Sequence, residues 1–372
     1  MQTSKVADYT RLGRLSIGNI GLFSGNSSGP PGVATCPFGH NAGLRDPPVD
    51  RIHRPMKLSS KILQAYVDRA LKGGSLDTAV VHPCDAESLG GAVAAAAAGL
   101  IDPILIGPPQ KIRAAAIAAG VDIEGLRLVA ADHSHAAAAR AVELVRAGDA
   151  HALMKGSLHT DELMGAIVAA HTGLRTARRI SHVFVMDVPL YPRPVLITDA
   201  AINIDPDLED KQDIVQSAID LAIVLGIRKP RVAILSAIET VTPRMRSTLD
   251  AAALCKMADR GQITGGIVDG PLAFDNAISL EAAAAKRIVS PVAGRADILV
   301  VPDLEAGNML AKQLHYFANA KSAGIVLGAR VPVILTSRAD SVETRVASCA
   351  IASLVAQAQA RLHRAAVRRA GR

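Results

Sequence analysis

From about residue 56 onward, short apolar runs alternate with longer amphipathic, alanine-rich segments. The runs have the length of strands and are rich in Val, Ile and Leu, whereas the segments between them are long enough for helices. This repetition predicts an α/β fold with mainly parallel sheets flanked by helices. The predicted strands are residues 78–82, 103–106, 126–130, 152–155, 182–186, 195–198, 232–235, 267–269, 298–301, 324–327 and 331–335, and the clearest helices are 87–100, 135–147, 161–170, 211–225, 304–321 and 342–355.

The number of predicted strands and the length of the chain both indicate more than one lobe. Eleven strands are many for a single twisted sheet, and 372 residues are more than one ordinary domain contains. Residues 1–55 lack a sustained hydrophobic period and are rich in turn-forming residues, so we expect a flexible extension there. They contain neither a P-loop nor a dinucleotide-binding glycine motif.

Composition and charge narrow the class of protein. Only nine residues are Phe or Tyr and none is Trp, so the core must be packed mainly from Ala, Val, Leu and Ile. The net charge of +7 comes from the two ends: residues 1–55 carry +3, residues 361–372 carry +5, and the remainder carries −1. Because no RNA-reading motif accompanies these ends, we expect no nucleic-acid partner.

The four cysteines are scattered and form no C-x-x-C pair, so neither a zinc site nor a disulfide framework is predicted. A reducing compartment is consistent with this pattern. The N-terminus has no signal-peptide pattern, and the longest apolar stretch is interrupted by Asp102-Pro103. We therefore expect a cytoplasmic protein without a membrane span.

Small, polar and charged residues follow many of the predicted strands, and in a parallel sheet those strand ends lie along one edge. One such group is Lys155, Gly156 and Ser157, followed by His159 at the start of a helix. A glycine, a lysine and the free amides of a helix start favour an anion, with phosphate as the first candidate. The alternative is an ordinary helix start capped by Thr160.

The stretch 331–341 is a second group of this kind. A buried strand with β-branched residues ends in Ser337, Arg338, Asp340 and Ser341 before the helix predicted at 342–355. These residues can form a catalytic mouth at the strand end or simply cap the helix, and the pattern alone favours neither.

Asp303 and Asn308 flank Gly307 in a turn that enters the helix carrying His315. They can contact a ligand or merely stabilise the turn. Histidines are numerous, but none has the spacing of metal ligands, so we predict no metal site. A Gly-x-Ser-x-Gly elbow is absent, which argues against a hydrolase triad.

Five motifs, in order and spacing, resemble the phosphate acetyl/butyryltransferase family. The resemblance covers about residues 60–360, and two further segments, 173–176 and 198–203, look closer to the butyryl than to the acetyl branch. The five motifs are Met154-Lys-Gly-Ser-Leu-His-Thr160, Asp269-Gly-Pro-Leu-Ala-Phe-Asp-Asn276, Ser290-Pro-Val-Ala-Gly294, Val301-Pro-Asp-Leu-Glu-Ala-Gly-Asn308 and Thr336-Ser-Arg-Ala-Asp-Ser341.

The resemblance implies a two-lobed fold similar to isocitrate and isopropylmalate dehydrogenases, with the active site between the lobes. Carried onto this chain, the first lobe is 56–174 plus 326–372, and the second is an inserted lobe, 175–325, through which the family usually forms a homodimer or a higher homo-oligomer.

The implied reaction transfers a short acyl group, acetyl or butyryl, reversibly between CoA and inorganic phosphate. CoA and acyl-CoA are then substrates, and no tightly bound cofactor is implied. Ser337 resembles the family serine that orients or stabilises the reacting carbonyl, and Arg338 matches a phosphate-binding arginine. Lys155, Gly156 and Ser157 would hold the other side of the anion.

Two positions depart from the acetyl branch. Thr344 replaces the aspartate found seven residues after the serine, and Met164 replaces an arginine in the helix after the Lys-Gly motif. Asp340 and Glu343 are the available bases, and Asp340 is preferred because it stays in the loop before the helix.

Two rival interpretations remain. The first is a catalytically silent acyl-CoA-sensing or partner-binding module of the same fold. The second is a metal-dependent β-decarboxylating dehydrogenase, but neither its carboxylate cluster nor a nicotinamide site can be assembled from the sequence. Fold alone would not decide between these functions.

Overall fold

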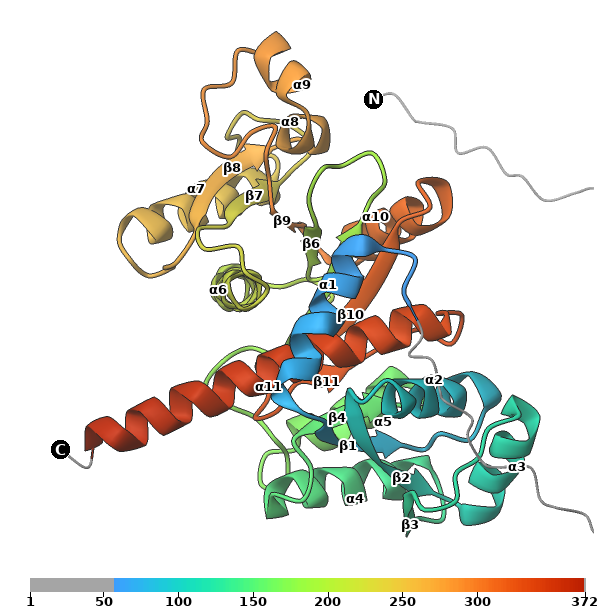
Figure 1. Ribbon diagram of the computed structural model, residues 1–372. Coiled ribbons are helices and arrows are strands. Elements are labelled where there is room, and N and C mark those ends of the chain that lie inside the picture. Colours follow the sequence, from blue (N-terminus) through green and yellow to red (C-terminus); the bar gives the residue numbers. More distant parts are fainter. Residues whose placement is uncertain (1–56, 371–372) are drawn as a thin grey trace, which may run out of the picture. The chain divides into compact units, whose positions relative to one another are not determined.

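The computed structural model describes residues 57–370, and the arrangement of their helices and strands is drawn in Figure 1. The extension predicted at residues 1–55 lies outside the described residues. Within the described part, every predicted strand is present, so the α/β class is confirmed. The strands are β1 (Leu76–Val81), β2 (Ile101–Gly107), β3 (Arg127–Ala130), β4 (Ala152–Lys155), β5 (Ser181–Asp187), β6 (Val195–Thr198), β7 (Arg231–Leu235), β8 (Ile267–Leu272), β9 (Ile298–Val300), β10 (Lys321–Leu327) and β11 (Val333–Ile334).

Helices connect most of these strands and cover the sheet. The α-helices are α1 (Lys61–Ala70), α2 (Ala86–Ala97), α3 (Pro109–Ala119), α4 (Ser134–Ala147), α5 (Thr160–Val168), α6 (Leu208–Val224), α7 (Arg246–Asp259), α8 (Phe274–Ile278), α9 (Leu280–Ala285), α10 (Leu304–Phe317) and α11 (Val342–Ala370), with a short 3-10 helix at Leu71–Gly73. α10 ends four residues before the prediction because Asn319 has a φ of 52°, a left-handed conformation that leaves the helix.

The strands are hydrogen-bonded into one sheet in the order β3-β2-β1-β4-β11-β10-β5-β6-β9-β7-β8. Seven of the ten neighbouring pairs are parallel, as predicted, and the three antiparallel pairs all involve β10 or β5 near the middle. One sheet therefore holds all eleven strands, more than we expected for a single sheet, because β10 pairs with β11 on one side and with β5 on the other.

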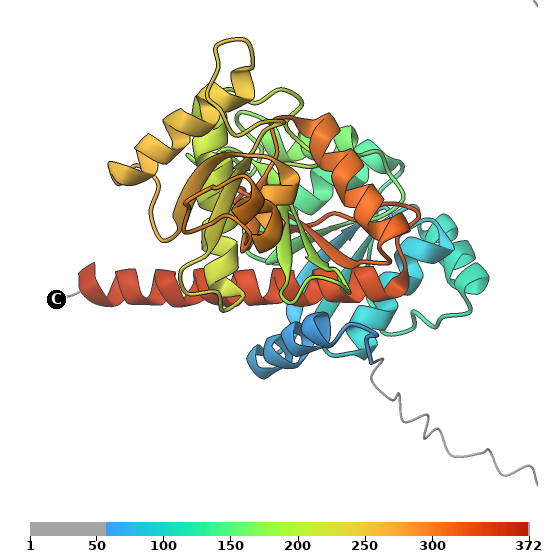
Figure 2. The ribbon, with the colours of Figure 1, turned by 90° about the horizontal axis from the view of Figure 1, so that it is seen from above.

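Small aliphatic side chains fill the core, as the composition requires. Three clusters of buried residues consist almost entirely of Ala, Val, Leu and Ile. α11 is buried from Thr344 to Val355, whereas Leu362 in its second half is 72% exposed. Figure 2 shows the C-terminal turns of α11 extending away from the other helices.

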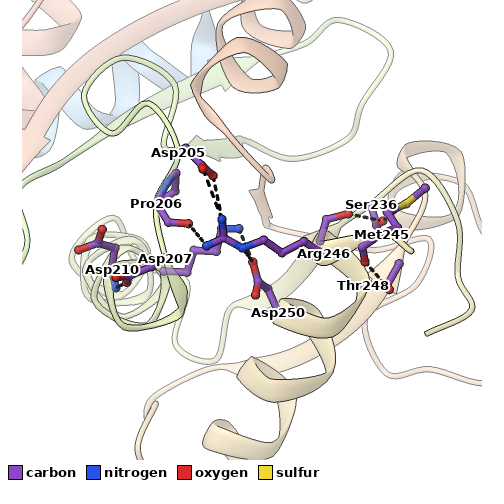
Figure 3. A network of polar contacts seen from close by, with 11 residues as sticks. Asp205, Pro206, Asp207, Asp210, Ser236, Met245, Arg246, Thr248 and Asp250 are labelled. Carbon is purple, nitrogen blue, oxygen red and sulfur yellow. Dashed lines mark hydrogen bonds and ion pairs between the residues drawn. The ribbon is translucent and has the colours of Figure 1, made fainter. Parts of the chain in front are cut away.

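A buried ion pair ties α6 to α7. Nζ of Lys211 lies 2.6 Å from Oδ2 of Asp250, and both residues are less than 10% exposed. Arg246 adds a second cation 3.6 Å from the same carboxylate and also reaches Asp205, 3.2 Å away, and the carbonyl oxygen of Pro206 (Figure 3). The carboxylate of Asp250 therefore compensates a lysine charge that has little contact with water.

We expect Asp250→Ala to destabilise the fold by about 3–5 kcal/mol, because it leaves the buried Lys211 ammonium without its counter-charge. Denaturant unfolding measures the effect. In the double variant Lys211→Met/Asp250→Ala the charge is gone, so most of the stability should return. Asp259→Ala breaks a pair with Lys256 at the exposed end of the same helix and should leave the unfolding midpoint unchanged. A midpoint for Asp250→Ala equal to that of the parent would contradict the assignment.

Candidate functional site

A cavity of about 360 Å³ opens where β4 and β11 end, facing α10. The size is within the range of small-molecule sites. Six of the nine residues predicted from the sequence line it: Lys155, His159, Asn308, Ser337, Arg338 and Asp340. Gly156, Ser157 and Asp303 are not among the lining residues. The other lining residues are Leu158, Thr160, Phe184, Met186, Ala201, Leu304, Ala311, Lys312, His315, Tyr316, Ser322, Leu335, Thr336 and Ala339.

The loop after β11 is held in a tight turn by its own hydrogen bonds. The amide of Ser337 donates to Oδ2 of Asp340 at 2.6 Å, and the amide of Asp340 donates to the carbonyl oxygen of Ser337 at 3.2 Å. Oγ of Ser337 accepts only the amide of Ala339, at 3.3 Å, among the described residues, so its hydroxyl hydrogen is available to a ligand. Ser341, the residue after Asp340, caps α11 because its Oγ accepts the amide of Thr344. Ser341 therefore matches the capping interpretation, whereas Ser337, Arg338 and Asp340 line the cavity.

Burial raises the pKa of Asp340 above its ordinary value. The Ser337 amide, Arg345, His315 and Lys155 each oppose that shift. The result is a half-buried carboxyl group that is more basic than an exposed aspartate and lies among cations. Glu343, the other base considered, accepts hydrogen bonds from the hydroxyl of Ser59 and does not line the cavity.

Lys155 ends β4 and is only 5% exposed. Its Nζ donates to the carbonyl oxygen of Gly156 at 3.3 Å. Burial lowers the pKa of this lysine, and the nearby Arg338 and Arg345 lower it further. Asp85 and Asp340 oppose this shift without cancelling it, so an anion in the cavity would stabilise the charged lysine.

Gly156 and Ser157 hold the loop after β4 against the end of β1. A Cβ on Gly156 would lie 2.3 Å from the carbonyl oxygen of Val81, which explains why the position needs glycine. Oγ of Ser157 donates to the carbonyl oxygen of His82 at 3.1 Å and accepts the amide of Cys84 at 3.2 Å. Their contacts thus position Lys155 rather than line the cavity.

His159, not Thr160, is the N-cap residue of α5, and both line the cavity. Its amide donates to Oε1 of Glu162 at 3.4 Å. The free amides of the first turn of α5 favour a negatively charged group nearby.

On α10, Asp303 and Asn308 have different surroundings. The Asp303 side chain caps the helix by accepting the amide of Ala306 at 2.8 Å, which matches the turn-stabilising alternative. Asn308 lines the cavity, and its Nδ2 donates to the carbonyl oxygen of Ala200 at 3.2 Å. Lys312 and His315 follow on the same helix face and also line the cavity. The sequence reasoning missed these two, although the spacing 308, 312, 315 is that of one helix face.

Arg345 is a further residue next to the site that the sequence pattern did not single out. It is 3% exposed and contacts the loop after β11 from the side of α11. Its place inside a mostly apolar helix segment was the available signal, because a fully buried arginine needs specific partners.

Neither a metal-binding cluster nor a membrane-crossing helix occurs within residues 57–370. Across that range, no group of three or more His, Cys, Asp or Glu side chains is placed to hold a metal ion. The helices between the same two residues include none with the combined length and apolarity that crossing a membrane requires.

Several relatives are similar to this chain over most of their length. The phosphate acetyltransferase of Rhizobium meliloti is 65% identical over 279 residues, which cover 75% of this chain and 88% of that protein. That of Rickettsia prowazekii is 62% identical over 308 residues, covering 82% and 88%. The phosphate butyryltransferase of Clostridium acetobutylicum is 44% identical over 258 residues, covering 69% and 86%.

These identities correct one detail of the sequence interpretation. The relatives named as acetyltransferases just cited are more similar to this chain than the one named as a butyryltransferase, whereas two short segments had suggested the reverse. Segments 173–176 and 198–203 cover ten positions, and an alignment of 279 residues outweighs them.

A comparison with solved structures points to the same family. A branched-chain phosphotransacylase from Enterococcus faecalis has a TM-score of 0.65 and 33% identity, covering 76% of this chain and 99% of that one. The model of the family described as phosphate acetyl/butaryl transferase matches residues 130–353, more than half of the chain. The strand-end cavity, the sequence relatives and the family model lead to one conclusion: this chain belongs to the phosphate acetyl/butyryltransferase family.

Proposed function

We propose that this chain catalyses the reversible transfer of a short acyl group, acetyl or butyryl, between CoA and inorganic phosphate. The observation that carries the proposal is the gathering of Ser337, Arg338 and Asp340 with Lys155 in one cavity, on loops far apart in the sequence. The membership of the family, whose name states this chemistry, supports it. CoA, acyl-CoA and phosphate are then substrates, and the chemistry requires no tightly bound cofactor.

In the direction of acyl-CoA synthesis, Asp340 takes the proton of the CoA thiol, and the thiolate sulfur attacks the carbonyl carbon of the acyl phosphate. Burial raises the pKa of Asp340, which makes it a better base than an exposed aspartate. The hydroxyl of Ser337 donates to the oxyanion that forms on the carbonyl. The C–O bond to phosphate then breaks as the carbonyl re-forms.

The departing phosphate is held by cations. Arg338 offers two parallel N–H groups to two phosphate oxygens, and Lys155 adds a charge from β4. Lys312 and His315 lie on the α10 side of the same cavity and are suited to the remaining negative charge of the substrates. In the reverse direction the same groups bind inorganic phosphate as the nucleophile, and Asp340 returns the proton to the CoA sulfur.

Three wider assignments belong to the same proposal. The first lobe comprises residues 56–174 and 326–372, and the second lobe comprises residues 175–325. The chain forms a homodimer through the second lobe. It works in the cytoplasm. Met309, Tyr316 and Phe317 on α10 are each more than half exposed, an apolar group that supports self-association. Sedimentation of the purified chain would measure the oligomer.

The function is tested by a panel of acyl-CoA thioesters from acetyl to hexanoyl, assayed with and without phosphate. We expect CoA release that depends on phosphate with acetyl-CoA or butyryl-CoA. Binding of CoA without turnover on any member of the panel would favour a silent acyl-CoA-sensing module instead.

Arg338→Ala should raise the KM for phosphate about tenfold or more, because a charge-assisted bidentate contact is lost. Thermal unfolding should stay unchanged, since the side chain is exposed. Arg140→Ala is the matched control, because Arg140 is exposed on α4 and pairs only with Glu143 among the described residues. Unchanged phosphate kinetics in Arg338→Ala would remove this arginine from the site.

Asp340→Asn should abolish most of the turnover and remove the acid limb of the pH profile. In the parent, activity should fall as the pH drops through the pKa of Asp340, which burial places above the ordinary value of about 3.9. A raised pKa means that the folded protein favours the protonated form, so this contribution to stability is lost as the pH rises through that pKa. At pH 7 the variant should therefore unfold no earlier than the parent. Asp102→Asn, at an exposed position of β2, should change neither activity nor its pH profile.

A further inference from the structure

Arg345 lies behind the loop that carries Ser337, in the first turns of α11. Its Nη1 donates to Oγ1 of Thr336 at 2.8 Å, and its Nη2 donates to the carbonyl oxygen of Ser337 at 2.9 Å. The carbonyl oxygen of Ser337 belongs to the peptide bond between Ser337 and Arg338, so this second hydrogen bond holds the backbone next to the Ser337 side chain. The guanidinium thus spans the two residues at which β11 becomes the loop, and it does not itself line the cavity.

Helix α2 leaves room for this side chain. A Cβ on Gly91 would lie 2.2 Å from Cδ of Arg345 and 3.1 Å from its Cβ. Gly90, the preceding residue, has no such neighbour, since the nearest atom to its Cβ would be that of Ala119 at 3.9 Å. A glycine is therefore required in this part of α2 only where the arginine stem passes.

The buried position of Arg345 is unfavourable for its charge. Burial lowers the pKa of Arg345, opposed by Asp340, Asp85 and Glu87, and its Nε has no hydrogen-bond partner among the described residues. An apolar side chain of similar length would avoid the cost of removing a guanidinium from water. What an arginine provides here, and an apolar side chain would not, is the pair of hydrogen bonds to the loop after β11.

We propose that Arg345 is a positioning residue of the acyl-transfer site, which holds Ser337 and Asp340 in their working geometry through the backbone of the loop. The inference rests on the proposed function. Arg345 contacts the loop at Thr336, at the carbonyl oxygen of Ser337 and, at 3.5 Å, at that of Arg338, and it stabilises the turn in which the Ser337 amide meets the Asp340 carboxylate.

Arg345 also acts on the site through its charge. The groups around the carboxyl of Asp340 are Arg345 on α11, His315 on α10, Lys155 on β4 and the Ser337 amide, and all of them favour its ionised form. Without Arg345, one of the charges that lower the pKa of Asp340 is lost. The effect of burial then raises that pKa further, and a larger fraction of Asp340 is protonated at a given pH. A residue with only a packing role would not change this balance.

The test compares Arg345→Met with Arg345→Lys. Arg345→Met should lower kcat about 10- to 100-fold, the equivalent of losing hydrogen bonds from a charged donor, with a smaller than threefold change in the KM for acyl-CoA. The acid limb of the pH–activity profile of Arg345→Met should move to higher pH. Arg345→Lys keeps the charge but has a single donor nitrogen in place of the two that contact Thr336 and Ser337, so it should restore the position of the acid limb and part of kcat. Hydrogen exchange of the amides of residues 337–341 should be faster in Arg345→Met than in the parent.

Gly91→Ala and Gly90→Ala form a matched pair that leaves Arg345 in place. Both replace a helical glycine by alanine, with the same gain in helix propensity. Gly91→Ala pushes the arginine stem and should lower kcat and speed exchange in the loop, whereas Gly90→Ala should behave as the parent. This pair keeps the proposal testable if Arg345→Met does not fold.

The outcomes separate the two proposals. If the parent shows no phosphate-dependent turnover, the proposed function fails, and the exchange experiment still decides whether Arg345 orders the loop. If the parent is active, a folded Arg345→Met with the kcat, the acid limb and the loop exchange of the parent overturns the positioning role. Loss of kcat in Arg345→Lys equal to that in Arg345→Met, with no shift of the acid limb in either, also overturns it.

Discussion

The site depends on the register of β11, a strand of only two residues. Val333 lies beside Leu153 and Ile334 beside Met154 in parallel pairing with β4, so Lys155 and the loop after β11 leave the sheet at the same level. On its other edge β11 pairs antiparallel with β10, which connects it to the second half of the sheet. A shift of one residue would turn the strand's side chains to the opposite face and move Ser337 away from Lys155.

Around that edge, the chain gathers more positive than negative charge. Lys155, Arg338, Lys312 and His315 line the cavity together with one carboxylate, Asp340. Lys155 is buried, and its pKa is lowered first by that burial and then by Arg338 and Arg345, against the opposing effect of Asp85 and Asp340. Such a site is complementary to a substrate with several negative charges, and the free amides at the start of α5 add to the same field.

The sequence pattern predicted all eleven strands within a few residues, because buried parallel strands are continuous apolar runs that contrast with alanine-rich helices. It also marked Ser337, Arg338, Asp340, Lys155, His159 and Asn308, which lie at strand ends or near the start of helices and share the cavity. It missed Lys312, His315 and Arg345. Their positions lie within helices, where a polar residue is ordinary unless the neighbouring element is known.

The fold class, the aliphatic core and the family follow from the amino-acid sequence alone, since they depend on local hydrophobic period and on short ordered motifs. Which polar residues face one another depends on the packed chain. Gly156 and Ser157 hold the loop against β1, Asn308 donates to the carbonyl oxygen of Ala200, and Asp340 rather than Glu343 lines the cavity. These distinctions arise from contacts between segments tens to hundreds of residues apart, and burial, which raises the pKa of Asp340 and lowers that of Lys155, exists only when those segments are packed together.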